Sequence, residues 1–283
     1  MKRHISKGAS LALVVVMYVI AIAAGIVFFL KMAGRMPEWA VLLAADIVST
    51  LVIWAFGLVY ENVSVYDPYW SVAPPVILTA WALYKGCWTQ PVLLLLAAVW
   101  CWGIRLTGNW IHTFRGLGHE DWRYTHYRVK QPPFLFQLTN LFGLNLMPTL
   151  VVFAGMLPGF GLFEVDDPVN PLTWVGFGLS LLAAIIQLVA DTQLHRFRKA
   201  HPEKVCHIGL WRNGRHPNYF GEILFWWGLW IMYASFEGVD WCIAGPIAMT
   251  ALFLFISIPL MESRQMHNKP GYREYRRNTR LLI

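Results

Sequence analysis

The stretch HIGLWRNGRHPNYFGEILFWW, residues 207–227, sets the organisation of the whole chain. It begins as a polar, basic loop and continues as an apolar, aromatic segment with helical character that keeps a single acid, Glu222. In a helix, Asn218, Glu222 and Trp226 fall at four-residue spacing and therefore share one face. An acid near the start of such an apolar helix needs either a partner or a function.

The loop of this stretch carries two cationic candidates, Arg215 and His216, directly before the helical segment. The start of a helix favours negative charge because its dipole and its free N–H groups point there. These two side chains are therefore predicted to bind an anionic ligand. The alternative is that a basic loop at the membrane surface binds lipid headgroups.

Composition indicates a membrane protein. The chain has 283 residues, of which 57% are hydrophobic and 14% charged, and its mean hydropathy is +0.47. It is too apolar for a soluble globular domain and too long for one membrane hairpin, so a polytopic helical membrane protein is expected. The formal charge of +7 is spread between apolar runs, which fits membrane orientation better than nucleic-acid binding. The four cysteines form no CxxC pair, so neither a disulfide framework nor a metal site is expected.

We predict one all-α domain, a transmembrane helical bundle of about eight spans with a cytoplasmic-facing cofactor cavity. The apolar runs that are long enough to be spans cover residues 11–30, 39–60, 72–84, 91–110, 134–157, 172–190, 219–235 and 241–260. The first run is interpreted as a membrane helix and not as a removed signal peptide.

Charge predicts the orientation of the bundle. The basic N-terminus (Lys2, Arg3, His4), the basic loops after the fourth and sixth spans and the C-terminal tail fall on one side. The acidic loops after the fifth and seventh spans fall on the other. The positive-inside rule then places both termini in the cytoplasm, with the chain in the inner (cytoplasmic) membrane.

Several polar clusters share the predicted cytoplasmic face. At the end of the sixth span, Asp191, His195 and Arg198 recur at helical spacing, so an acid, an imidazole and a guanidinium lie on one face, unless this is only a solvated helix end. The loop after the fourth span holds the mixed-sign cluster DWRY, residues 121–124. Arginine and tyrosine from distant loops would suit a large polyanionic cofactor beside a lipid-side substrate. Asp46, inside the second span, is a further functional candidate.

These residues carry a family resemblance. The segment GLWRNGRHPNYFGE (residues 209–222) resembles the steroid 5-alpha-reductase-like membrane family, and more narrowly its bacterial branch, domain of unknown function 1295. The other matching positions are Ala190, Asp191, Gln193, Leu194, Arg198 and the closing pattern ME…Y-EY--NT. The resemblance covers the chain roughly from Asp67 to the C-terminus.

The resemblance implies a multi-span reductase that transfers hydride from NADPH to an activated carbon–carbon double bond, usually an enone. Its substrate would be steroid-like or otherwise lipophilic and would enter from the bilayer, among membrane lipids. The family's cofactor residues would fall on Asp191, Arg198, Asn218, Tyr219, Glu222 and Trp226. The predicted cofactor-binding set also includes Arg105, Arg115, Asp121, Tyr124, His195, Arg215, His216, Arg264 and Tyr275. Arginine would clamp phosphates, and acids would hold ribose hydroxyls and the carboxamide.

The expected catalytic residues depart from the family pattern. Steroid reductases use an acid in an early span and a tyrosine shortly before the position of Arg105. Here that region reads AVWCWGIR, with Trp100 and Trp102 where the tyrosine would stand. We therefore predict that Tyr66, Asp67 or Glu61 supplies the proton, with Tyr69 as a further possible substitute. The alternative is that the aromatic residues here form an interfacial belt.

Two other functions stay open. Membrane methyltransferases of the isoprenylcysteine or phospholipid type, which use S-adenosylmethionine, also carry an RHP-Y-G segment and a late acid, here Glu262, followed by Tyr272 and Tyr275. The Asp191 face, Asn218 and the many arginines favour a dinucleotide instead. The missing tyrosine also fits a non-catalytic sterol- or lipid-binding membrane protein.

Overall fold

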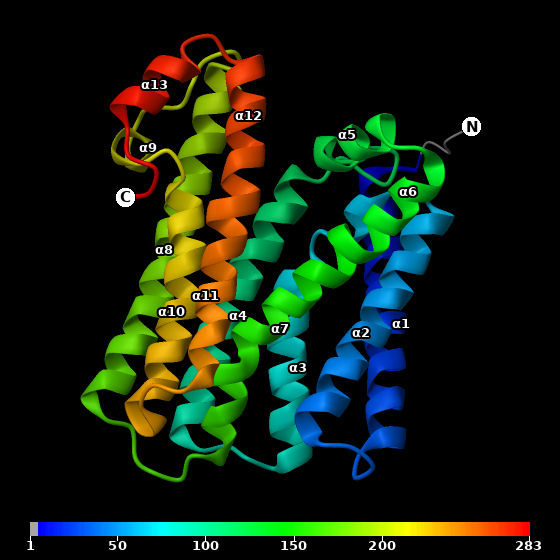
Figure 1. Cartoon of the computed structure of the whole chain (residues 1–283), viewed down its shortest axis with the longest axis vertical. Coiled ribbons are helices and arrows are strands. Elements are labelled where there is room, and N and C mark those ends of the chain that lie inside the picture. Colours follow the sequence, from blue (N-terminus) through cyan, green and yellow to red (C-terminus); the bar gives the residue numbers. More distant parts are fainter. Residues whose placement is uncertain (1–4) are drawn as a thin grey trace. The chain divides into compact units, whose positions relative to one another are not determined.

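The computed structural model describes residues 5–283, in which helices form all the regular structure except one isolated β-bridge, between Gly214 and Arg280 (Figure 1). The prediction of an all-α fold is confirmed. The elements, with 3-10 and π-helical stretches written η, are α1 (Lys7–Met32), α2 (Glu38–Val59), η1 (Val63–Tyr66), α3 (Tyr69–Lys85), α4 (Gln90–Thr113), α5 (Trp122–Lys130), α6 (Pro133–Leu138), η2 (Thr139–Leu146), α7 (Met147–Gly161), η3 (Leu162–Glu164), α8 (Pro171–Ala200), α9 (Leu210–Asn213), α10 (Pro217–Glu237), η4 (Trp241–Ile243), α11 (Ala244–Ala251), η5 (Leu252–Ser257), α12 (Ile258–Asn268) and α13 (Tyr272–Asn278).

Within residues 5–283, six helical segments are long and apolar enough to cross a membrane. They are Lys7–Met32, Glu38–Val59, Gln90–Thr113, Pro133–Glu164, Pro171–Ala200 and Trp241–Asn268. The predicted spans 72–84 and 219–235 lie within α3 and α10, which are helical but are not among the six. Membrane-helix character is thus supported, while the count of eight spans and the orientation stay predictions. The basic residues Lys2, Arg3 and His4 lie outside the described residues.

Local chemistry explains where α8 begins and why it runs past the predicted span. The side chain of Asn170 accepts hydrogen bonds from the backbone N–H groups of Leu172 and Thr173, and the Thr173 hydroxyl accepts one from the backbone of Asn170. This reciprocal capping box, with Pro171 at the first turn, fixes the start. The helix continues to Ala200 because its polar last turns still favour helix.

The chain divides into two compact units whose boundaries fall inside α3, α4 and α7. Unit 1 comprises the chain up to Val76 together with Leu106–Phe153. Unit 2 comprises Ile77–Arg105 and Ala154–Ile283. The prediction of a single domain stays a prediction, and the two units are described separately.

In unit 1, α1 and α2 lie side by side (Figure 1). They approach closely at Gly25, where an added Cβ would lie 2.3 Å from the Ser49 hydroxyl oxygen. Ser49 in turn donates a hydrogen bond of 3.0 Å to the carbonyl of Ala21 on α1. Small residues and interhelical hydrogen bonds of this kind are typical of helix pairs in membranes.

In unit 2, α8 and α10 form the most extensive helix pair, again through small residues (Figure 1). A Cβ added to Gly176 would lie 2.6 Å from the backbone nitrogen of Met232 and 2.7 Å from the carbonyl of Gly228. Gly221 faces Gln187 and the carbonyl of Ala183 at similarly short range. The two backbones therefore touch, which fixes how side chains on α8 and α10 face each other.

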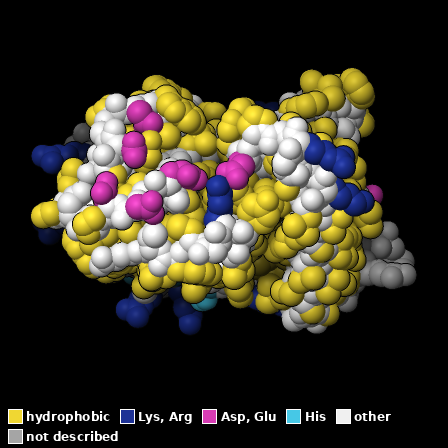
Figure 2. Space-filling view, turned by 90° about the horizontal axis from the view of Figure 1, so that it is seen from below, with side chains coloured by type: hydrophobic (Ala, Val, Ile, Leu, Met, Phe, Trp, Pro, Cys, Tyr) yellow, Lys and Arg dark blue, Asp and Glu magenta, His cyan; other side chains and the backbone are white. Residues whose placement is uncertain are grey.

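Acidic side chains gather at one end of unit 2 (magenta in Figure 2). Glu164 ends η3, and the loop between η3 and α8 holds Asp166 and Asp167. The loop after α10 holds Asp240, which accepts a hydrogen bond of 2.7 Å from Tyr233. The amide of Asn170 donates to the carbonyl of Ser235, so both loops lie at the same end of this helix pair.

Replacing Gly176 by valine should destabilise the protein, because the new side chain would overlap the backbone of α10. We expect a loss of about 1–3 kcal/mol or more, the usual cost of overpacking, seen as a lower midpoint of thermal unfolding in detergent. Gly178 is the matched control, because an added Cβ there meets nothing within 4 Å. Equal shifts for Gly176→Val and Gly178→Val would contradict the close approach of the two helices.

Candidate functional site

The centre of the candidate site in unit 2 is Arg105, near the end of α4, held between two acids. Its Nη1 donates a hydrogen bond to Asp191 Oδ2 at 2.9 Å, and its Nη2 donates to Glu222 Oε1 at 3.2 Å. The three side chains are only 6–11% exposed. Buried charges are tolerated when they are paired in this way, so α4, α8 and α10 are joined by one ionic cluster.

Neutral donors complete this cluster. Asn218 donates to Asp191 Oδ1 at 3.3 Å, and the indole N–H of Trp102 donates to Glu222 Oε2 at 2.9 Å. Each of the four carboxylate oxygens thus accepts one hydrogen bond. The structure therefore brings together Arg105, Asp191, Asn218 and Glu222, four of the residues assigned to cofactor binding from the sequence; that role stays a prediction.

Trp102 also belongs to the site, although it was not among the residues assigned to cofactor binding from the sequence. It lies three residues before Arg105 on α4 and stacks on Phe225, with ring centroids 4.8 Å apart and an interplanar angle of 10°. Its ring also meets Trp226 edge-on at 5.3 Å. The spacing of three residues from Arg105, which places both on one helical face, was the signal that could have found it.

Some buried polar atoms around the cluster have no hydrogen-bond partner among residues 5–283. They are Arg105 Nε, both amide atoms of Gln187 and the indole nitrogen of Trp226. Gln187 is fully buried and lies one helical turn before Asp191 on α8. Buried polar groups are nearly always satisfied in folded proteins, so these atoms are candidates for contact with a ligand.

A second cluster in unit 2 surrounds Glu262 on α12. Glu262 Oε1 accepts a hydrogen bond from Arg215 Nε at 2.7 Å and lies 3.3 Å from His216 Nε2, while its Oε2 pairs with Arg276 Nε at 3.0 Å. Arg215 also donates to the carbonyls of Arg276 and Thr279. Its guanidinium is therefore engaged by the C-terminal segment, apart from the Asp191 cluster.

The residues around Glu262 hold the loop that precedes α10. Burial lowers the pKa of His216, and the hydrogen bond with Glu262 offsets part of this shift. The ring of Tyr219 stacks on His216, and Tyr275 donates its hydroxyl to the carbonyl of Trp211. These contacts position the first turn of α10, which carries Asn218.

One guanidinium and one imidazole extend the Asp191 face along α8. Arg198 lies seven residues after Asp191 and is exposed, whereas His195, between them, is half-buried. Arg264 on α12 is also half-buried. Of the predicted phosphate ligands in this unit, Arg198 is thus the one on the Asp191 face that is open to solvent.

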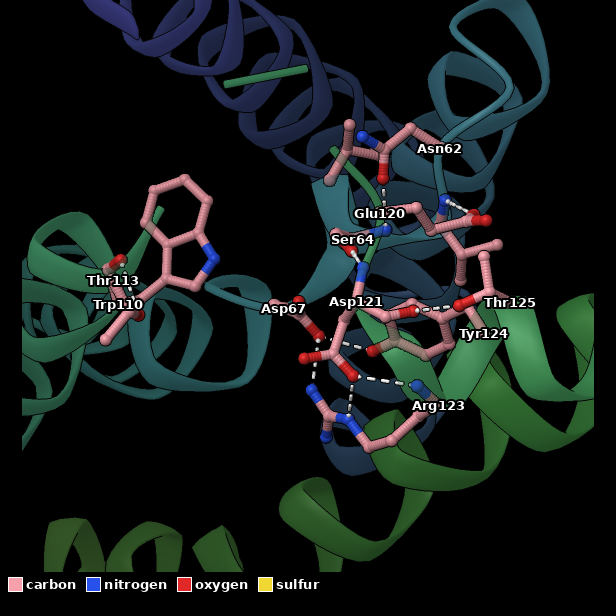
Figure 3. A network of polar contacts seen from close by, with 12 residues as sticks. Asn62, Ser64, Asp67, Trp110, Thr113, Glu120, Asp121, Arg123, Tyr124 and Thr125 are labelled. Atoms are coloured by element: carbon pink, nitrogen blue, oxygen red, sulfur yellow. Dashed lines mark hydrogen bonds and ion pairs between the residues drawn. The ribbon is translucent and has the colours of Figure 1, made fainter. Parts of the chain in front are cut away.

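Unit 1 holds a separate polar cluster around Asp67, directly after η1 (Figure 3). Asp67 Oδ1 accepts a hydrogen bond from the hydroxyl of Tyr124 and another, at 3.3 Å, from Arg123 Nη2. Asp121 caps α5 by accepting from the backbone of Arg123 and also accepts from Arg123 Nε at 2.8 Å. The predicted residues Asp67, Asp121 and Tyr124 are therefore brought together, with Arg123 as the member that sequence reasoning did not single out.

Electrostatics in this cluster favour a proton on Asp67. Burial raises the pKa of Asp67 from 3.8 to about 6, although Arg123 and the hydrogen bond from Tyr124 pull it down. Burial and the charge of Asp67 likewise raise the pKa of Tyr124. The pair can thus hold or release one proton close to neutral pH.

The other residues predicted for catalysis or cofactor binding in unit 1 lie apart from the Asp67 cluster. Tyr66 is buried, and its hydroxyl lies 2.7 Å from the hydroxyl of Thr149. Glu61 is exposed in the turn after α2, where its backbone adopts a positive φ of 50°. Arg115 is exposed in the loop between α4 and α5.

Comparison with known proteins gives the family but no reaction. Residues 53–279 match the family model described as "Protein of unknown function (DUF1295)". The chain is also similar to uncharacterized protein C594.04c of Schizosaccharomyces pombe, with 21% identity over 252 residues, which cover 79% of this chain and 73% of that protein. No solved structure matches. Since the family model covers most of the sequence, the chain belongs to the DUF1295 family.

Proposed function

We propose that this protein is a membrane-embedded, NADPH-dependent reductase of an activated carbon–carbon double bond in a lipophilic substrate. The observation that carries the proposal is the buried cluster in unit 2, in which Arg105 joins Asp191 and Glu222 beside Asn218. When bound, NADPH would supply the hydride. The chain's own residues would bind the nucleotide, orient it and exclude water.

The donor and acceptor groups of the cluster suit the nicotinamide half of a dinucleotide. Carboxylates accept hydrogen bonds from ribose hydroxyls, and the amide of Asn218 can both donate and accept. Gln187 and Arg105 Nε offer further groups that no residue of 5–283 satisfies. Most of the cluster is therefore paired within the protein, and the few unpaired atoms are the ones a ligand would reach.

Arg198 is the residue we assign to the phosphates. It lies seven residues beyond Asp191 on α8, about 10 Å along the helix axis at 1.5 Å per residue. A guanidinium binds phosphate oxygens through directed, charge-assisted hydrogen bonds. Arg215, the other candidate, already contacts Glu262 and two backbone carbonyls, so we assign it to the support of the α10 loop.

When a hydride adds to one carbon of an activated double bond, the displaced π-electron pair moves to the other carbon or to the carbonyl oxygen, and that atom needs a proton. General acids work best when their pKa lies near the operating pH. Asp67, whose pKa burial raises to about 6, meets this requirement in unit 1. Among the proton donors predicted in unit 1, we therefore favour Asp67, with Tyr124 as its hydrogen-bond partner, over the exposed Glu61.

A methyltransferase remains the second candidate, for a specific reason. The cluster contains one arginine and two acids, so with both acids ionised it has a net negative charge that would also suit the cationic sulfur of S-adenosylmethionine. Titration of the purified protein with NADPH, NADH and S-adenosylmethionine, followed by tryptophan fluorescence, separates the two functions. Quenching by S-adenosylmethionine alone would refute the reductase.

Replacing Arg198 by alanine should weaken NADPH binding by about 1–3 kcal/mol, or roughly 5- to 150-fold, because one charge-assisted phosphate contact is lost. Fluorescence titration measures the dissociation constant. Arg196 is the matched control, since it is exposed on the same helix two residues earlier and faces away from Asp191. Unchanged affinity in Arg198→Ala, or an equal loss in Arg196→Ala, would contradict the assignment.

Asp67 should make the stability of the protein depend on pH. Its pKa in the folded protein, about 6, lies above the ordinary 3.8, so its favourable contribution is complete below about pH 4 and is lost as the pH rises through 6. Between these limits the stability of the wild type relative to Asp67→Asn should fall by on the order of 3 kcal/mol. Thermal unfolding midpoints of both proteins across this range provide the measurement. A difference between the two proteins that does not vary with pH would show that Asp67 titrates normally.

A further inference from the structure

The last part of unit 2, from Pro259 to Ile283, forms a flap that is attached differently from the rest of the unit. The flap comprises most of α12, then α13 and the C-terminal segment, and α13 lies beside α9 (Figure 1). Among residues 259–283 only two side chains, Glu262 and Tyr272, are buried. The backbone of α12 comes close mainly to its neighbours in sequence, η5 and α13, whereas α8 and α10 pack along their lengths. Apolar burial therefore contributes little to holding the flap.

Polar contacts hold the flap instead. Glu262 is its anchor and accepts a hydrogen bond of 2.7 Å from Arg215 Nε, in the loop before α10. Arg215 in turn donates to two backbone carbonyls of the flap, and its own backbone N–H donates to the carbonyl of Arg280 at 2.9 Å. The hydroxyl of Tyr275 donates to the carbonyl of Trp211. Water replaces such contacts when they separate, so the net free energy that each one contributes is small and the flap can open.

The flap is joined to the rest of unit 2 at a point where the helix is easily bent. Residues Leu252–Ser257 form the π-helical stretch η5, and Pro259 follows in the first turn of α12. Proline has no backbone N–H, so Pro259 cannot make the usual hydrogen bond to the carbonyl four residues earlier. Sharp bends of helices occur mainly at π-helical turns and at prolines. A bend between η5 and α12 would move the flap and leave α11 in place.

The loop that the flap grips is itself firmly attached to α8. Trp211 packs against Phe197, and its indole N–H donates to the carbonyl of Ala190 at 2.9 Å. The backbone N–H of Leu210 donates to the side chain of Gln193, also at 2.9 Å. These contacts involve no residue of the flap, so the loop keeps its place on α8 when the contacts of the flap break. The flap is therefore the movable partner.

The candidate site in unit 2 needs a movable element. The side chains of Arg105, Asp191 and Glu222 are only 6–11% exposed, so a dinucleotide cannot reach them unless part of the protein moves. The backbones of α8 and α10 touch, and close-packed helices do not separate without losing this packing. The flap, in contrast, grips the loop that ends at His216, two residues before Asn218. Its release would free the first turn of α10 to move Asn218 away from Asp191.

We propose that the flap is a lid, which opens at η5 to admit the nucleotide and closes when Glu262 pairs with Arg215 again. The inference rests on the proposed function for the identity of the ligand, but not for the motion. In the closed state the first turn of α10 is held, so Asn218 stays hydrogen-bonded to Asp191 and water is kept from the bound nicotinamide. In the open state water hydrates the separated ions, and no covalent bond changes.

Amide hydrogen exchange of the ligand-free protein in lipid nanodiscs tests the motion. Glu262→Gln keeps the size of the side chain and removes the charge that holds Arg215. Residues 259–283 should then exchange about tenfold faster, the effect of one lost charge-assisted contact, while exchange in α11 stays unchanged. Glu274→Gln is the matched control, because that acid is exposed on α13 and the same charge is removed. Unchanged exchange in Glu262→Gln, an equal effect of Glu274→Gln, or acceleration that extends through α11 would overturn the lid.

Stopped-flow tryptophan fluorescence with NADPH tests the control of access. A lid that must open before binding limits the association rate as well as the dissociation rate. Glu262→Gln should therefore raise both rate constants, whereas a residue that only positions Asn218 would affect dissociation alone. Tyr275→Phe removes the hydrogen bond to Trp211 and should act in the same direction, so misfolding of one variant still leaves a test.

An association rate constant that is not raised in either variant would refute the lid. A wild type that binds no NADPH would refute the proposed function, and the hydrogen-exchange experiment then decides by itself whether the flap opens.

Discussion

The architecture of unit 2 depends on the pairing of Arg105 with Asp191 and Glu222. These three charged side chains are almost inaccessible to solvent, and each would be costly to bury alone. Their mutual hydrogen bonds tie α4 to both α8 and α10. The close approach of Gly221, directly before Glu222, to Gln187 and the carbonyl of Ala183 brings α8 and α10 near enough for one guanidinium to reach an acid on each.

The buried polar groups of this protein fall into three kinds. Those around Glu262 are satisfied within the chain and fasten the C-terminal segment to the loop before α10. Those around Arg105 are satisfied except for a few atoms, which include the amide of Gln187. Asp46 has hydroxyl neighbours but no cation among the described residues. We infer that the first kind supports the fold and that the second binds a ligand, because buried polar atoms without a partner are the ones left to make further contacts.

Helical periodicity predicted the parts of the site that lie on one element. The shared face of Asn218 and Glu222 follows from their spacing, and so does the placement of Arg198 on the face of Asp191. Tertiary pairings were not predictable in this way. Glu262 is 47 residues from Arg215, and Trp102 is 120 residues from Glu222, and no local pattern specifies contacts at such separations.

The same limit applies to the ends and number of the spans. Hydropathy located every long helix, but it ended the sixth run at residue 190, whereas α8 continues for ten more residues as a polar helix. Hydropathy reports where a helix can lie in a membrane, while helix propensity and capping determine how far it extends. Asp191 and Arg198 therefore lie on one continuous helix, which fixes the distance between their positions along the helix axis.

The most direct test of the central claim is a cryo-electron microscopy structure of the protein with NADPH. We expect density for the nucleotide in unit 2, with its nicotinamide half against Arg105, Asp191 and Asn218 and its phosphates beside Arg198. Density for the nucleotide elsewhere would contradict this expectation. So would a site beside the Arg105 cluster that is empty with NADPH and is occupied only when S-adenosylmethionine is added.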